Sequence, residues 1–214
     1  MGLPVLIIGK SGSGKSTSLR NFQEHEVAVI NVLGKRLPFR NSWRTYSTDD
    51  YSKIVSAIAK SERNTIVIDD AGYLMTNQFM RSHSQTGGGN AVFGLYNNIG
   101  DSFWNLVNFV ANALPEQKIV YFLMHEDKND FGEVKPKSIG KMLDEKVCLE
   151  GMFSIALRCM YKDGKHIFLT NTEDGLCVSK SPMGMFELPE IDNDLKYVDQ
   201  TIRNYYEFGG NENV

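Results

Sequence analysis

The stretch Gly9-Lys10-Ser11-Gly12-Ser13-Gly14-Lys15-Ser16-Thr17 decides the fold of this chain. It matches the pattern G-x-x-x-x-G-K-[ST] at every fixed position. An apolar run at residues 4–8 precedes it, and residues 15–23 are expected to form a helix. A strand, a glycine-rich loop and a helix in this order aim backbone N–H groups and the positive end of the helix at one point, where phosphate binds. The whole stretch is therefore predicted to bind a nucleoside triphosphate, which we take to be ATP.

A second motif supplies carboxylates for the same site. The run Thr65-Ile66-Val67-Ile68 is apolar or β-branched throughout, which is typical of a strand buried on both faces of a parallel sheet. Asp69 and Asp70 follow at its carboxyl end, where open α/β sheets bind their ligands. Asp69 is predicted to hold Mg²⁺ together with the Ser16 hydroxyl, and Lys15 to reach the β- and γ-phosphates. Asp70 is predicted either to polarise the attacking water as general base or to cap the helix that follows it.

Composition places the chain among soluble globular proteins. Apolar residues make up 42% of the 214 residues and charged residues 23%, which suits one domain with a hydrophobic core. With a net charge of −3, the surface as a whole is not positively charged. Any contact with nucleic acid must therefore use a local basic patch or one formed when subunits assemble. The three cysteines have no C-x-x-C spacing, and the chain shows no leader of signal length. No apolar run approaches about 20 residues. These observations predict a cytoplasmic protein with no membrane partner.

The other regular segments predict an α/β fold, in which helices flank a mostly parallel sheet. Residues 27–31 and 119–124 are apolar or β-branched runs expected to be buried strands, and residues 103–114 have the spacing of an apolar helix face. His125 follows the strand at 119–124. In nucleotide-binding sheets of this type, a polar residue at the tip of the strand between the phosphate-loop strand and the carboxylate strand can touch the γ-phosphate, and His125 is predicted to be that residue.

The last third of the chain has a different character. Two strand-like runs around Asp163-Gly164 predict a C-terminal β-hairpin extension, and a further strand is expected at 176–179. Asp192 or Asn193 is expected to begin a closing helix. We therefore expect a core at residues 1–187, followed at residues 188–214 by that helix and a frayed tail.

Three irregular segments carry polar or basic residues. Residues 33–47 hold four basic side chains and predict either a solvated loop or one that faces DNA or a partner. Residues 81–90 include three successive glycines and predict a mobile loop, which either orders on a partner or is an idle surface loop. Residues 127–141 predict a long loop that leaves the edge of the sheet where the site lies.

The order of these features resembles the RecA core. More narrowly, it resembles the short phage-encoded ATP-binding proteins that are reduced RecA-like cores, some of which act as single-strand annealing recombinases. The resemblance covers roughly residues 3–187 and rests on the phosphate loop, the Ile-Asp-Asp strand, the strand that ends in His-Glu, the lysine-rich loop and the hairpin followed by Lys-Ser-Pro. It implies a P-loop NTPase with Asp69 as its Walker B aspartate and His125 in the position that RecA fills with a glutamine.

The same resemblance implies partners. Residues 126–141 match the loop that RecA-like proteins place on single-stranded DNA, which implies DNA contacts from lysines in that segment: Lys128, Lys135, Lys137 and Lys141. Lys180 lies near the lysines that RecA-like subunits offer in trans to a neighbour's γ-phosphate, which implies a homo-oligomer with ATP at subunit interfaces. A phage-encoded protein of this kind would act in recombination, annealing or replication in the cytoplasm of a bacterial host, where a single-strand binding protein is a candidate partner.

One departure from that pattern leaves the activity open. RecA carries a catalytic glutamate at the end of its second strand, and this chain has Asn31-Val32-Leu33 there. Either Asp70 takes over as base, or hydrolysis is slow and ATP mainly controls assembly. Two other functions remain: a nucleotide or small-molecule kinase, which the absence of arginine between Met124 and Cys148 disfavours, and a weakly hydrolysing, ATP-dependent interaction module.

Overall fold

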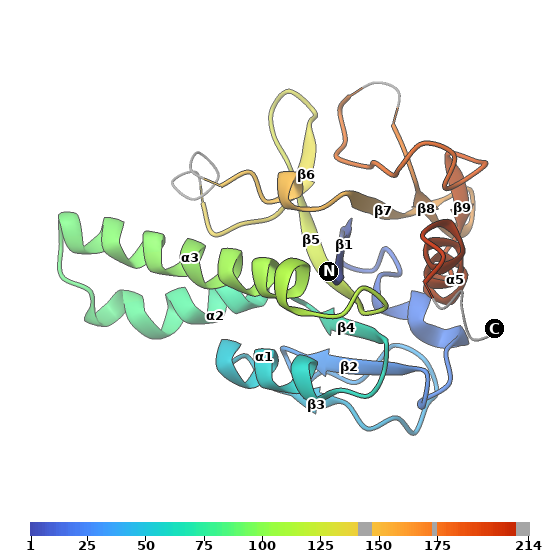
Figure 1. The fold of residues 1–214 in the computed structure, drawn as a ribbon. Coiled ribbons are helices and arrows are strands. Elements are labelled where there is room, and N and C mark those ends of the chain that lie inside the picture. The colour runs from blue at the N-terminus through green and yellow to red at the C-terminus, as the bar shows by residue number, and fades with distance from the viewer. Residues whose placement is uncertain (141–146, 173–174, 209–214) are drawn as a thin grey trace.

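The computed structural model describes residues 1–140, 147–172 and 175–208. Lys141, which the resemblance assigns to DNA binding, and the tail at 209–214 lie outside the described residues. Figure 1 shows a central sheet with helices packed on both of its faces. Among the described residues, no helix combines the length and the apolar character needed to cross a membrane.

The sheet has the strand order β3-β2-β4-β5-β1-β7-β8-β9. In that order the strands are Tyr46–Ser47, Val27–Asn31, Thr65–Asp69, Ile119–Lys128, Leu3–Gly9, Ile155–Lys162, Lys165–Leu169 and Glu190–Asp192. All neighbours from β3 to β7 pair in parallel, whereas β7, β8 and β9 pair antiparallel. The short strand β6, Val134–Pro136, lies off this path and pairs antiparallel with β5. The predicted α/β class with a mostly parallel sheet is confirmed.

Helices cover the two faces of the sheet unequally. The helices α1 (Tyr51–Lys60), α2 (Tyr73–Ser82) and α3 (Asn90–Ala113) pack on one face, and η1 (Ser16–Asn21) and α5 (Leu195–Tyr205) pack on the other. Two further 3₁₀ turns are η2 (His83–Gln85) and η3 (Glu150–Met152). The strands between these layers are apolar on both faces, which is why they read as unbroken apolar runs in the sequence.

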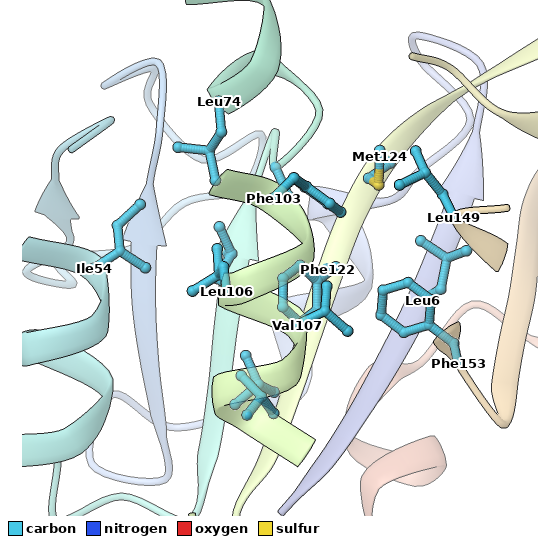
Figure 2. Close-up of a cluster of buried hydrophobic side chains, with 14 of the residues drawn as sticks. Leu6, Ile54, Leu74, Phe103, Leu106, Val107, Phe122, Met124, Leu149 and Phe153 are labelled. Atoms are coloured by element: carbon cyan, nitrogen blue, oxygen red, sulfur yellow. The ribbon is translucent and has the colours of Figure 1, made fainter. Parts of the chain in front are cut away.

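The larger core lies between α3 and the middle of the sheet. Phe103 and Val107 of α3 pack over Phe122 of β5, as Figure 2 shows, and the rings of Phe103 and Phe122 lie 6.0 Å apart edge to face. Leu6 of β1 is also in this cluster, whereas its neighbour Val5 belongs to the cluster on the opposite face. Successive residues of a strand point to opposite faces, so β1 is anchored in both cores and the loop at its end starts from a fixed point.

The segment 81–90 differs from the prediction. Arg81 and Ser82 end α2, residues 83–85 form η2, and Asn90 begins α3. The helices α2 and α3 run side by side (Figure 1), and of the residues between them only 86–89 are irregular. The predicted loop at 81–90 is therefore shorter than expected, and its mobility stays a prediction. Leu95 and Ile99 continue the apolar face of α3 toward its N-terminus. The three glycines directly before the helix masked this extension of the apolar face in the sequence.

Two segments near the site also differ. The expected helix at 15–23 is a 3₁₀ helix of six residues, Ser16–Asn21, so the contribution of a helix dipole to phosphate binding is small. The segment 127–141 is not one long loop, because Glu126 pairs with Pro136 and Lys128 with Val134 in a β5–β6 hairpin.

The C-terminal part confirms one prediction and corrects two. The hairpin β7–β8 turns at Asp163-Gly164, both with positive φ (49° and 80°), as expected for a two-residue turn. The expected strand at 176–179 is only an isolated bridge at Cys177. The closing helix α5 is capped by Asp194, whose carboxylate accepts hydrogen bonds from two backbone N–H groups, and not by Asp192 or Asn193. Residues 188–208 add β9 to the sheet and α5 to the second core, and the boundary at 187 stays a prediction.

Candidate functional site

Three neighbouring strands end at the candidate site. β5 lies between β1 and β4, with Gly9 of β1 paired with His125 of β5. The carboxyl ends of these strands surround a cavity of about 210 Å³. It is lined by Ser11, Gly12, Gly14, Lys15, Ser16, Thr17, Lys35, Arg36, Pro38, Asp69, Asp70 and His125. The structure thus brings together the phosphate loop, both aspartates and the histidine that the sequence singled out.

The glycine-rich loop is held by strands from the C-terminal part of the chain. The His166 ring nitrogen Nδ1 donates to the Ser13 carbonyl at 2.6 Å. Gly14 has φ of 106°, and a Cβ added there would lie 2.8 Å from the same ring nitrogen. A Cβ at Gly9 would lie 2.4 Å from the Cys159 carbonyl oxygen. Both positions therefore require glycine, since any side chain would push the loop off β7 and β8.

Lys15 is buried inside the loop. Its ammonium donates to the carbonyl oxygens of Gly9 at 2.7 Å and of Lys10 at 2.9 Å. An ammonium has three N–H donors, so these two bonds leave one for a ligand in the cavity. Burial lowers the pKa of Lys15 because the charged form loses hydration.

Ser16 and Asp69 form the part of the site that suits a metal ion. The Ser16 hydroxyl donates to Oδ1 of Asp69 at 2.7 Å. Burial raises the pKa of the Asp69 carboxyl, and the bond from Ser16 opposes this effect. Asn31 on β2 pairs in register with Asp69, and its buried Oδ1 has no hydrogen-bond partner among the described residues.

Hydroxyl, carboxylate and amide oxygens are the ligands that Mg²⁺ prefers in proteins, so the residues present fit this ion. No group of three or more His, Cys, Asp or Glu side chains in residues 1–140, 147–172 and 175–208 could hold a metal. Mg²⁺ at Ser16 and Asp69 would therefore complete its shell with phosphate oxygens and water.

Asp70 lies in the cavity in an unusual backbone conformation. Its φ is 60°, which is uncommon for a residue with a side chain; such residues occur in turns and cluster at functional sites. Its carboxylate accepts a hydrogen bond from Lys35 at 2.9 Å and lies 3.5 Å from Nε2 of His125. The alternative role of Asp70 as a helix cap is wrong, because α2 is preceded by Gly72 and has no side-chain cap.

His125 is set up to be neutral. Burial lowers its pKa, and the positive charge of Lys15 lowers it further, which outweighs the attraction of Asp70. Its ring meets that of Tyr73 edge to face at 5.9 Å. A neutral imidazole has one donor and one acceptor nitrogen, so His125 can donate a hydrogen bond without adding charge.

Lys35 and Arg36 are the site residues that sequence reasoning missed. They belong to the basic segment 33–47, which is an exposed loop at these two residues, and the structure also places them in the wall of the phosphate cavity. Lys35 also lines a second cavity of about 480 Å³, which shares Ser11 and His125 with the first. The sequence shows that these two cations follow the strand at 27–31 closely, but it does not show that this strand neighbours β4.

The remaining predicted residues are more scattered. Lys137 lines the second cavity, and its backbone N–H donates to the His125 carbonyl at 2.7 Å. Lys128 is exposed at the end of β5, and Lys135 lies on β6; neither of them lines the two cavities. Lys180 pairs through its backbone with Ala156 and is also absent from both cavity walls.

A larger cavity of about 660 Å³ lies at the opposite ends of the strands, lined in part by Thr65 and Asp199. Two ion pairs lie in its wall, Lys196 with Glu26 and Arg203 with Asp199. Asp199 accepts hydrogen bonds from Thr65, Tyr121 and Arg203. These bonds hold α5 against the sheet, so the polar groups of this cavity stabilise the fold. The candidate functional site is therefore the smaller cavity at the phosphate loop.

Comparison with known proteins agrees with the geometry of the site. A family model described as an AAA domain matches residues 1–183. That span contains the phosphate loop, both aspartates and His125. A search of curated proteins found none that matches this chain.

Proposed function

The chain belongs to the AAA domain family, which indicates a nucleotide-binding ATPase, and we propose that it uses ATP and Mg²⁺ to act on single-stranded DNA. The observation that carries the proposal is the convergence of Lys15, Ser16 and Asp69 at the carboxyl ends of β1 and β4. These residues supply the ammonium and the metal ligands that phosphoryl transfer needs.

The residues around the cavity account for hydrolysis. Lys15 neutralises charge on the β- and γ-phosphates, and Mg²⁺ held by Ser16 and Asp69 would spread the charge that develops on the transferred group. Asp70 accepts a proton from the attacking water, and neutral His125 donates a hydrogen bond to the γ-phosphate. Water attacks the γ-phosphorus, the bond to the β-phosphate oxygen breaks, and ADP and phosphate leave.

Single-stranded DNA is the proposed partner because of the lysines beside the site. Lys128 is exposed on the β5–β6 hairpin, and Lys137 lines the second cavity next to His125. Contacts between lysines and phosphates release counterions, so affinity should fall steeply with salt, with a slope of about −0.7 per phosphate contacted. A hairpin that extends the strand of His125 would let DNA binding influence the γ-phosphate.

The finer assignment is a RecA-like protein that works as a homo-oligomer in phage recombination, annealing or replication. Lys180 is half-buried and absent from its own chain's cavity walls, which is compatible with a role in trans at a neighbour's γ-phosphate. ATP would then lie at subunit interfaces in the cytoplasm of a bacterial host, and a single-strand binding protein is a further candidate partner.

ATP hydrolysis with and without single-stranded DNA tests this function, with Lys15→Ala as control. We expect stimulation by DNA that the control loses, and a smaller stimulation in Lys128→Ala and Lys137→Ala. No DNA binding at low salt in the presence of ATP would overturn the role on DNA. Transfer of phosphate to a nucleotide acceptor would identify a kinase instead.

An interaction module is the second candidate, and one contact favours it. Asp70 is already paired with Lys35, so the proposed base is not free to accept a proton. A module of this kind would bind ATP tightly, turn it over slowly even with DNA, and hold a partner only in the ATP state. Slow turnover unaffected by DNA, combined with tight ATP binding, would support this second function.

A further inference from the structure

The contact between Lys35 and Asp70 joins a basic side chain to the proposed base inside the phosphate cavity. The Lys35 ammonium lies 2.9 Å from Oδ2 of Asp70, and both residues line the cavity together with Lys15 and Ser16. The Asp70 side chain is 12% exposed, whereas the Lys35 side chain is 59% exposed. The carboxylate is thus fixed in the wall of the cavity, and the ammonium is at the end of a flexible stem that can move.

The backbone of Lys35 is held in place by the end of β2. Asn31 is 1% exposed, and its amide Nδ2 donates to the Lys35 carbonyl at 2.5 Å. Gly34, with φ of 65°, turns the chain so that its N–H meets the Asn31 carbonyl at 3.4 Å. Asn31 is also the register neighbour of Asp69. Asn31 therefore fixes the backbone of Lys35 beside Asp69, the proposed metal ligand.

The ammonium of Lys35 has a second contact, with Tyr73 in the wall of the second cavity. Its ammonium lies 5.5 Å from the centre of the Tyr73 ring, within the range of a cation–π interaction. The hydrogen bond to Asp70 raises the pKa of Lys35, so its ammonium stays charged. Lys35 therefore brings a full positive charge to the cavity from within its own chain.

We propose that Lys35 senses the γ-phosphate in cis by exchanging its partner, from Asp70 to the γ-phosphate of bound ATP. This inference rests on the proposed ATP binding. A terminal phosphate carries more negative charge than one carboxylate and offers three oxygen acceptors, so it competes with Asp70 for the ammonium. The exchange releases the Asp70 carboxylate to accept the proton of the attacking water. With ADP bound, the competing phosphate is absent and Lys35 returns to Asp70.

The exchange predicts a preference for ATP over ADP that depends on Lys35. Affinities are measured by titration with fluorescent ADP and with a fluorescent ATP analogue whose β–γ bond cannot be hydrolysed, so that turnover does not enter. We expect Lys35→Met, which keeps the stem and removes the charge, to weaken binding of the ATP analogue about tenfold. Binding of ADP should change less than about twofold, since Lys35 then stays paired with Asp70 and does not contact the nucleotide.

Arg40→Met is the matched control, because Arg40 is exposed on the same segment and does not line the phosphate cavity. It should keep the preference of the natural protein. The role of Lys35 would be overturned if Lys35→Met kept the preference for the ATP analogue over ADP. It would also be overturned if Arg36→Met lost that preference and Lys35→Met did not. Absence of nucleotide binding in the natural protein would overturn the proposed function as well, so the two failures are distinguishable. Thermal melting of each variant checks that it is folded.

Discussion

Replacing Arg158 by alanine should destabilise the frame that carries the phosphate loop. Arg158 lies on β7 and Glu126 on β5, so their ion pair spans the strand β1 that lies between them. It is bidentate: Nε and Nη2 of Arg158 each donate to a Glu126 oxygen at 2.8 Å. Glu126 directly follows His125, and Arg158 pairs in register with Ile8, the residue before Gly9.

The magnitude follows from burial. The Glu126 side chain is 2% exposed and that of Arg158 is 19% exposed, so the variant leaves a buried carboxylate without its partner. Breaking a buried pair in this way costs about 3–5 kcal/mol of the free energy of unfolding. For a chain of 214 residues, that loss lowers the melting temperature by about 6–20 °C.

Thermal unfolding followed by circular dichroism measures this loss. Lys162→Ala is the matched control, because Lys162 also lies on β7 but its pair with Glu190 is exposed, and water screens such pairs. We expect the control to melt within the scatter of repeated melts of the natural protein. The double variant Glu126→Gln/Arg158→Met should recover part of the loss, since no buried charge remains. An Arg158→Ala variant as stable as the control would refute the reasoning.

Three further predictions concern the metal ligand, the histidine and a helix cap. Asp69→Asn should weaken Mg²⁺ affinity about 10- to 100-fold while leaving nucleotide binding in chelator unchanged, as measured by nucleotide titration; equal losses in both buffers would contradict the metal role. Burial lowers the pKa of His125 in the folded protein below its ordinary 6.5, so the unfolded chain takes up the proton more readily. The free energy of unfolding is therefore unaffected by His125 above about pH 6.5 and falls as the pH drops below that value. Between pH 7.5 and 5.5, the free energy of unfolding in urea should fall more for the natural protein than for His125→Gln. Equal falls in the two proteins would refute this assignment. Asp194→Ala should cost about 1 kcal/mol in urea unfolding by removing the cap of α5, whereas an unchanged midpoint would mean that water replaces the cap.

The strands, loop and turn that could be predicted from the sequence are those marked by residues close together in the chain. β1, β4 and β5 are buried on both faces, so their apolar runs were visible, and the phosphate loop has fixed spacing. The turn at Asp163-Gly164 was visible because few residue pairs adopt its conformation. Each of these features is determined by residues close together in the chain.

The parts that it did not predict depend on distant contacts or weak signals. Lys35 enters the site because Asn31 lies beside Asp69 in the sheet, and a basic loop alone does not reveal that neighbour. β9 has three residues with acidic ends, so no apolar run marks it. The glycines at 87–89 predicted an interruption, whereas α3 begins at Asn90 directly after them, and Leu95 and Ile99 pack its first turns against the core.

Titration calorimetry of ATP in the presence of Mg²⁺ tests the central claim, that the carboxyl ends of β1, β4 and β5 form an ATP site. The natural protein should bind one ATP per chain. Lys15→Ala should bind at least about tenfold more weakly, because the variant loses the charged hydrogen bond to phosphate. No binding by the natural protein, or equal affinity in both proteins, would contradict the site as described.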